Sequence, residues 1–216
     1  MGLITSLLAI TLRAGTSLVY ATIGETYTER AGILNLGLEG IMLMGAVSSF
    51  ATAYYSGSLA LAIVVALCVG ATLSLIHAFL TVTMKANQVV SGLSITLFGT
   101  GFASFLGQRL GPASNGRYLI GLTGPRFTPI DIGPLKDVPI LSAILGQDLF
   151  TYGIYILIPL AWFYMYRTRN GLWLRAIGEN PRTADAMGVD VNRSKYAYTI
   201  FGGMMTSLGG AHLALA

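Results

Sequence analysis

The sequence has very little charge: 10% of its 216 residues are Asp, Glu, Lys or Arg, whereas 54% are hydrophobic. A soluble domain carries roughly 25% charged residues, because its surface must be hydrated. This shortage excludes a water-soluble globular fold. The few charges are also clustered, so long apolar runs remain between them.

Cysteine and histidine are nearly absent. The single cysteine, Cys68, excludes an internal disulfide, and we interpret it as a small buried apolar residue. His77 and His212 have no acidic or metal-ligand partner nearby in the sequence, which favours hydrogen-bonded packing roles. The sequence also has no P-loop, zinc or nucleophile motif. We therefore expect no catalytic residue, no metal and no cofactor in this chain, and no enzymatic activity of its own.

Six runs almost free of charge are present, and each is close to the 17–25 residues that cross a hydrocarbon core of about 30 Å. Backbone groups in lipid must be satisfied within their own segment, so such runs form helices. We predict an all-α fold: a polytopic membrane bundle of about six spanning helices in one domain, 1–216. The predicted spans are 1–24, 31–54, 59–84, 89–107, 149–166 and 196–216.

The basic residues set the expected orientation. Segments 25–30, 85–88 and 167–195 carry eight Lys or Arg residues, against four in 55–58 and 108–148. The positive-inside rule then places 167–195 in the cytoplasm and the N-terminus outside. This placement also explains the net charge of +4 without a nucleic-acid partner. Segment 108–148, with five of the seven prolines, is predicted to be an external loop, either a plain connector or a docking surface or lid.

Small residues are spaced at i, i+4 and i+8 in two of the runs. Gly99, Ala103 and Gly107 form one stripe, and Gly203, Ser207 and Ala211 form another. Small residues let helices approach closely in membranes, where no hydrophobic force drives them together. The stripes predict a packed bundle and carry no information about activity.

Two charges lie inside predicted spans, Arg13 and Glu39. They are at similar depth, roughly 12–16 Å from the inner end of their helices. An unpaired charge there costs at least about 2.5–3.5 kcal/mol, so we expect the two to pair, with Asn35 as a competing partner of Glu39. Gly37 and Gly40 flank these polar residues, and this pattern is typical of the broken helices that line transporter sites.

The segment between the last two spans contains helix signals. Asn180 is a suitable N-cap, Pro181 fits the first helical position and Gly188 suits the position after the helix, which predicts a two-turn helix over 181–187. A short helix with apolar residues between two spans fits insertion into a groove on a cytoplasmic partner. A helix resting on lipid headgroups is the alternative.

Two stretches resemble a known family. "RTRNGLWLRAIGENPRTADAMGVDVNRSKY" (167–196) is similar to the coupling loop of ABC importer permeases of the ribose, branched-chain amino acid and nucleoside group. "ERAGILNLGLEG" (29–40) resembles a second motif of that group, most closely its nucleoside or simple-sugar branch. Together the motifs are fairly specific, and the likeness extends over nearly the whole chain.

The resemblance implies the transmembrane permease subunit of an ATP-driven importer in the plasma (inner) membrane, moving a nucleoside or simple-sugar-like solute. Its partners would be cytoplasmic ATPase subunits that bind the ATP, a second permease subunit in a homo- or heterodimer, and an extracytoplasmic substrate-binding protein. The implied translocation path lies near Asn35, Gly37, Glu39 and Gly40. The residues implied to contact the ATPase are Arg175, Ala176, Gly178, Glu179, Asn180, Pro181, Ala184 and Gly188.

The sequence departs from the family at its end. Members continue through several more helices after the coupling loop, whereas this chain stops at Ala216, so we expect a truncated permease. The alternative function is a stand-alone secondary transporter that uses Glu39 or Arg13 for ion coupling.

Overall fold

The computed structural model describes residues 3–112, 116, 118–129 and 145–216. Within these ranges all regular structure is helical and no strand occurs, so the all-α prediction is confirmed. The helices are α1 (Leu3–Arg30), α2 (Leu38–Ser56), α3 (Leu59–Ala78), α4 (Gln88–Arg109), α6 (Leu149–Arg167), α7 (Arg169–Glu179), α8 (Pro181–Ala186) and α9 (Val191–Leu215), with a π-helical turn, η1 (Phe79–Thr83), at the end of α3.

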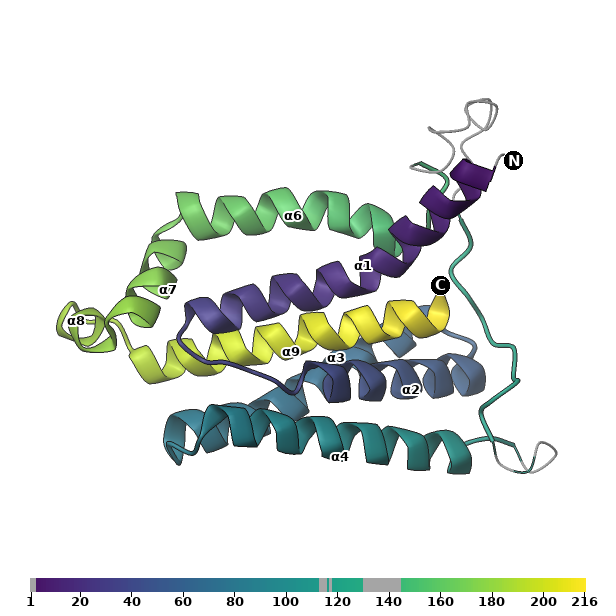
Figure 1. The fold of residues 1–216 in the computed structure, drawn as a ribbon, viewed down its shortest axis with the longest axis horizontal. Helices are drawn as coiled ribbons and strands as arrows, with labels where there is room; N and C mark the ends of the chain where they lie inside the picture. The colour runs from purple at the N-terminus through teal and green to yellow at the C-terminus, as the bar shows by residue number, and fades with distance from the viewer. Residues whose placement is uncertain (1–2, 113–115, 117, 130–144) are drawn as a thin grey trace.

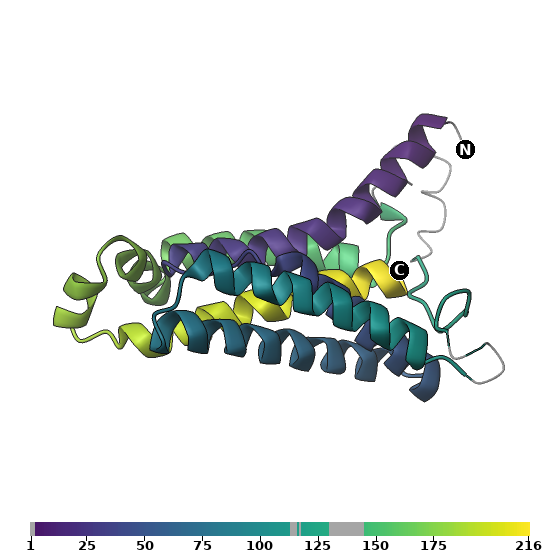
Figure 2. The ribbon, with the colours of Figure 1, turned by 60° about the horizontal axis from the view of Figure 1, so that its bottom comes forward.

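The long helices of the described residues are α1, α2, α3, α4, α6 and α9. They run between two ends of the molecule (Figures 1 and 2). Helix α9 lies in the centre and packs against α1, α2 and α3; α6 packs on α1, and α4 packs on α2. The short helices α7 and α8 lie at one end, and both chain termini lie at the other (Figure 1). Successive long helices alternate in direction. The 167–195 segment therefore lies a full bundle length away from the two termini (Figure 1).

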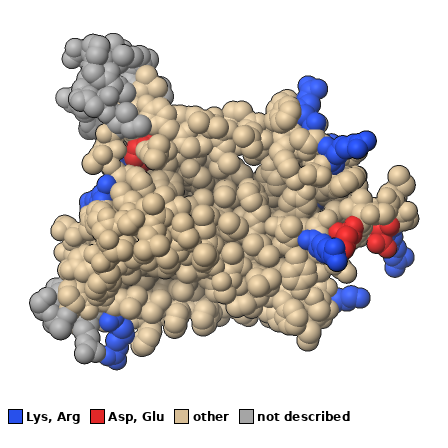
Figure 3. Space-filling model, turned by 180° about the vertical axis from the view of Figure 1, so that it is seen from behind, with Lys and Arg blue, Asp and Glu red and all other residues tan. Residues whose placement is uncertain are grey.

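Among the described residues, four helices are long and apolar enough to cross a membrane by length and composition: Leu7–Arg30, Leu59–Thr83, Gln88–Arg109 and Leu149–Arg167. The other two long helices, α2 and α9, were also predicted as spans, and both pack in the interior of the bundle. Helices shielded by protein need less apolar surface, since they contact lipid less. Lys, Arg, Asp and Glu lie towards the two ends of the face seen in Figure 3, with an uncharged band between them.

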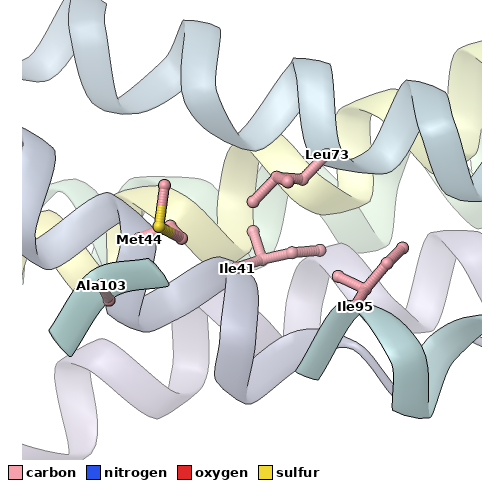
Figure 4. Packing of buried hydrophobic residues seen from close by; sticks show 5 residues of the cluster. All are labelled: Ile41, Met44, Leu73, Ile95 and Ala103. Atoms are coloured by element: carbon pink, nitrogen blue, oxygen red, sulfur yellow. The ribbon is translucent and has the colours of Figure 1, made fainter. Parts of the chain in front are cut away.

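Close backbone contacts explain the small-residue stripes. A Cβ on Gly99 would lie 2.6 Å from the backbone of Gly40, so α2 and α4 touch through glycine. In the second stripe Ser207 Oγ donates to the Ala66 carbonyl at 2.6 Å, and Ala211 is fully buried. Gly107 is the exception, with open space around it. Side by side with the glycine contact, Ile41, Met44, Leu73, Ile95 and Ala103 form the core between α2, α3 and α4 (Figure 4).

The structure differs from the sequence-based expectations for the end of α1 and for Cys68. Residues 25–30, expected in a loop, continue α1 to Arg30, and the non-helical connection is 31–37 instead. Cys68 is exposed, not buried, because α3 turns Ala62, Ala66 and Gly70 inward and leaves the thiol on its outer face. Much of the expected external loop 108–148 lies outside the described residues, at 113–115, 117 and 130–144.

Candidate functional site

The segment between α6 and α9 is built on a helix, α7, that was not expected from the sequence. The Thr168 side chain caps it by accepting the Gly171 backbone N–H at 3.1 Å. Leu174 and Ile177, three residues apart, are fully buried, and Leu174 packs with Tyr27, Ala31 and Met165 of the bundle. The threonine cap and the i, i+3 apolar pair were the signals that could have predicted this helix.

The end of α7 touches the end of α1 through Gly178. A Cβ at this position would overlap the Arg30 carbonyl oxygen, and the Gly178 Cα lies 3.5 Å from where a Cβ on Gly32 would be. Only glycine fits such a backbone-to-backbone contact without displacement. The contact therefore joins the α7–α8 segment directly to the connection between α1 and α2.

Helix α8 begins and ends as its sequence predicts. Asn180 Oδ1 accepts the Thr183 N–H at 3.2 Å, and Pro181 occupies the first turn. Gly188 has φ of +84°, and the Val189 N–H returns to the Ala184 carbonyl at 3.1 Å. These are an asparagine N-cap and a left-handed glycine termination. The predicted helix over 181–187 is confirmed, with its last regular residue at Ala186.

Two clefts flank α8. The one between α7 and α8 has a volume of about 510 Å³ and is edged by the exposed side chains of Leu172, Trp173 and Met187, the last 80% exposed. The other, about 800 Å³, is polar and lies between α8, the 188–190 connection, the start of α9 and Lys85. An apolar cleft with an exposed methionine can receive an apolar side chain from another protein.

The eight residues that the resemblance assigns to partner contact do not form one surface. Ala176, Glu179, Asn180 and Ala184 line the apolar α7–α8 cleft. Pro181 and Gly188 line the polar cleft on the other face of α8. Gly178 faces the bundle, and the Arg175 guanidinium lies 5.2 Å from the centre of the Tyr166 ring. Leu172, Trp173 and Met187, which form the exposed apolar edge of the cleft, are among the apolar residues that the sequence shows in and just before the short helix.

The 31–37 connection is not helical: its first residues hydrogen-bond back to the end of α1, and side chains of three helices satisfy the backbone groups that follow. The Asn35 N–H donates to Glu25 Oε1 at 2.9 Å, and the Leu34 N–H donates to Gln88 Oε1 at 2.8 Å. Thr96 Oγ1 donates to the Leu36 carbonyl at 2.8 Å. A glycine-broken segment is therefore present, placed before α2 and not within it.

His77 completes this network. Its Nε2 lies 3.2 Å from the Leu34 carbonyl and its Nδ1 lies 2.9 Å from Ser91 Oγ. The ring is fully buried, which confirms the hydrogen-bonded packing role expected for it. Its partners lie 43 and 14 residues away in the sequence, so no local pattern could identify them.

The four residues assigned to a translocation path do not line one groove: Glu39 lines the groove between α1 and α2, and the other three do not. Asn35 is buried and turns its Oδ1 to the Gly37 N–H at 2.9 Å. Gly37 and Gly40 pack against α4, where a Cβ on Gly40 would lie 2.5 Å from the Ile95 carbonyl oxygen. Glu39 is exposed and lines a groove of about 400 Å³ between α1 and α2, together with Glu25 and Glu29.

Arg13 is not paired with Glu39. Its Nε lies 3.7 Å from Asp148 Oδ2, and the same carboxylate oxygen lies 3.1 Å from His212 Nε2. The expected pairing is wrong because α6, which begins just after Asp148, packs along α1 and brings this carboxylate beside Arg13. The depth of a charged residue along its helix limits which residues it can pair with. The rotation of the helices and their packing determine which of these pairs forms.

Asp148 was missed because it flanks a predicted span instead of lying inside it. It is 1% exposed and caps α6 by accepting the Thr151 N–H at 2.9 Å. Burial raises the pKa of this carboxyl, but hydrogen bonds from His212 and from the Thr151 backbone lower it by more, so the net shift is downward. Ser17 Oγ lies 2.8 Å from His212 Nδ1, so one buried network joins α1, α6 and α9. An Asp directly before an apolar run was the available N-cap signal.

The chain matches the family model described as "Branched-chain amino acid transport system / permease component" over residues 7–216. It is 39% identical over 219 residues to a putative glucose ABC transporter permease protein, TsgC13, of Haloferax volcanii, covering 100% of this chain and 64% of that protein. It is 32% and 34% identical, each over 209 residues, to the guanosine permease NupQ of Bacillus subtilis and the nucleoside permease NupC of Lactococcus lactis, covering 93% of this chain and 64% of each relative. No solved structure matches the chain significantly.

Proposed function

The chain belongs to the branched-chain amino acid transport system permease component family, and from that membership we propose that it acts within the membrane subunit of an ATP-driven importer. The solute we propose is a nucleoside or a simple sugar, since the named relatives are permeases for glucose, guanosine and nucleosides. The chain spans 64% of the length of these relatives, and the proposal is for the protein that contains it. It is a multi-pass membrane protein with four helices able to cross a membrane.

The observation that carries the proposal is the α7–α8 segment. It is a closed pair of short helices at one end of the bundle, with an apolar cleft whose edge is exposed at Leu172, Trp173 and Met187. A partner protein can bind the exposed apolar edge. Because the segment packs on the bundle, movement of that partner would be transmitted to the helices. We propose that a cytoplasmic ATPase subunit buries this edge, binds the ATP and hydrolyses it.

The contacts of α7 can transmit a displacement of α8 to the rest of the bundle. Displacement of α8 reaches α7 through Asn180, and α7 reaches α1 and the 31–37 connection through Gly178. That connection is held by Glu25, His77 and Gln88, one side chain from each of α1, α3 and α4. We propose that ATP binding by the partner shifts this connection and changes the packing of those three helices together.

The groove between α1 and α2 is the part of the path that we propose from this chain. Glu39 faces it from the first turn of α2. Gly37 and Gly40 hold this end of α2 against α4, and Asn35 accepts the Gly37 N–H, so we propose that these three position Glu39 at the path. The complete path would require a second permease subunit and the remaining helices of the relatives. We propose that the bundle lies in the plasma membrane with α7 and α8 in the cytoplasm, and that an extracytoplasmic binding protein delivers the solute at the opposite end.

The proposal is tested by co-purification of the full-length protein with its ATPase. Met187→Ser removes the most exposed apolar side chain of the cleft edge, and Met84→Ser removes a 62% exposed methionine from the α3–α4 connection at the same end. We expect Met187→Ser to lower ATPase retention about tenfold, the loss of one well-buried apolar contact, and Met84→Ser to leave it unchanged.

Uptake measured in the same variants separates the proposal from secondary transport. An ATP-driven importer loses uptake together with ATPase retention. Uptake that persists without bound ATPase and depends on Glu39 would support the secondary transporter and overturn the importer.

A further inference from the structure

The corner where α6 ends and α7 begins gathers three arginines and two exposed aromatic side chains. The Arg167 Cζ lies 5.8 Å from the centre of the Trp162 ring, and the Arg175 Cζ lies 5.2 Å from that of Tyr166. Arg169 is exposed in the first turn of α7. We call Trp162, Tyr166, Arg167, Arg169 and Arg175 the α6–α7 corner.

The positive charge of this corner has no carboxylate partner in the part of the chain that the structure describes. No Asp or Glu occurs in the sequence from 149 to 178. Within the described residues none of the three arginines forms an ion pair, whereas Arg193 pairs with Asp190 at 3.0 Å. The first turn of α7 also has no acidic residue to meet the positive end of the helix dipole. In Figure 3 basic atoms appear at the upper corner, where α6 meets α7, without acidic atoms beside them.

The aromatic rings place the corner at the depth of lipid headgroups. Trp162 and Tyr166 are 54% and 44% exposed on a helix able to cross the membrane. Trp162 lies five residues before Arg167, about 7.5 Å along the helix axis. Trp and Tyr concentrate at this boundary because their rings are apolar and their N–H or O–H groups are polar. The arginines therefore lie just outside the apolar layer, where phosphate groups are found.

We propose that the α6–α7 corner binds the phosphate of an anionic phospholipid headgroup. The guanidinium groups match a phosphate geometrically and electrostatically, because each offers several N–H donors in one plane. The guanidinium groups of Arg167 and Arg175 already lie against aromatic rings. They therefore lose less conformational entropy on binding a phosphate than free arginine side chains would. The site involves neither the α7–α8 cleft edge nor the α1–α2 groove, and it does not depend on which solute is transported.

The test uses the fluorescence of Trp162 in lipid vesicles. Residues 1–216 contain two tryptophans, so Trp173→Phe, with phenylalanine also in place of any tryptophan elsewhere in the full-length protein, leaves Trp162 as the single emitter. The protein is reconstituted in phosphatidylcholine mixed with brominated phosphatidylglycerol, and in the reverse mixture with brominated phosphatidylcholine. The ratio of quenching by the two brominated lipids measures the preference for the anionic headgroup beside Trp162.

We expect a clear preference for phosphatidylglycerol, reduced about five-fold by each of Arg167→Gln and Arg175→Gln. Arg167→Lys with Arg175→Lys keeps the charge and should keep most of the preference, which guards against a folding defect in the glutamine variants. Arg193→Gln is the control, since that arginine already has a carboxylate partner.

Three results would overturn the lipid site. In the first, the glutamine variants retain the full preference for phosphatidylglycerol. In the second, Arg193→Gln reduces the preference as much as they do, which would indicate a general effect of net charge. Quenching by brominated phosphatidylglycerol that is abolished by millimolar inorganic phosphate, at constant ionic strength, would assign the corner to a free anion.

Discussion

His212 Nε2 lies 3.1 Å from Asp148 Oδ2, although 64 residues separate the two in the sequence. Both side chains are 1% exposed. Asp148 also caps α6, and its other contacts, with Arg13 and Thr151, extend the network to α1. The pair therefore fixes the ends of α6 and α9 against α1 at the end of the bundle opposite α7 and α8.

Removing this carboxylate should destabilise the bundle more than removing an ordinary helix cap. Asp148→Ala leaves His212 and Arg13 without their acceptor, and breaking a buried pair costs about 3–5 kcal/mol. Asp190→Ala is the matched control, because Asp190 caps α9 in the same way, through the Arg193 N–H at 3.0 Å, but is 53% exposed. Its loss should cost about 1 kcal/mol. Thermal unfolding of the purified variants in detergent measures both, and equal shifts in Tm would contradict a special role for the Asp148 pair.

Acid should remove the contribution of Asp148. Its pKa in the folded chain is lowered below the usual value, so the carboxylate binds protons less readily when folded than when unfolded. Its stabilisation is complete above the unfolded pKa of about 3.9 and is lost as the pH falls through the lower folded value. Tm measured from pH 6 down to pH 3 should fall more steeply below about pH 4 in the wild type than in Asp148→Asn. Parallel curves would show that other groups cause the acid sensitivity.

The glycine contact between α2 and α4 should not tolerate a methyl group. In Gly40→Ala the new Cβ would lie 2.5 Å from the Ile95 carbonyl oxygen, and separating the helices costs about 1–3 kcal/mol. Gly101→Ala, on the open face of α4, meets no atom within 4 Å and should be neutral or stabilising by up to about 1 kcal/mol. Tm in detergent distinguishes the two, and a Gly40→Ala protein as stable as Gly101→Ala would contradict the close approach.

Gly178→Ala should affect the seating of α7 on the bundle. The added Cβ would overlap the Arg30 carbonyl, so the end of α7 must move away from α1. We expect increased amide hydrogen exchange in α7, and in the 31–37 connection that Gly178 contacts. Gly15→Ala, a helical position with no atom within 4 Å, is the control and should leave exchange in both segments unchanged. Unchanged exchange in Gly178→Ala would remove the proposed mechanical link between α8 and the connection.

His77→Ala should loosen the 31–37 connection from the opposite side. The Leu34 carbonyl and Ser91 hydroxyl lose their buried partner, which costs about 1–3 kcal/mol for each unsatisfied group. Replacement by Gln retains hydrogen-bonding capacity and should recover part of the loss. Tm of the two variants measures the effect, and identical losses would indicate that the ring acts by filling space.

Local signals in the sequence were sufficient for some of the site. Asn180, Pro181 and Gly188 determine where α8 begins and ends, because each acts through the backbone conformation of its own neighbours. The Thr168 cap and the Leu174–Ile177 pair carried similar information for α7. The apolar runs likewise indicated the long helices, though α1 continues through Glu25 and Glu29, where charge alone suggested a loop.

By itself, the sequence determined that this protein is an all-α membrane bundle, since low charge and run length act segment by segment. The resemblance of 29–40 and 167–196 to a known family, and not these properties, indicated a permease. Only the tertiary structure decided which polar groups meet: Arg13 with Asp148 in place of Glu39, His212 with the same carboxylate, and His77 with the Leu34 carbonyl. It also decided that Cys68 faces outward and that α8 is flanked by two different clefts. The physical reason is that depth along a helix follows from the chain, whereas the rotation of each helix and the choice of its neighbours follow from packing all of them together.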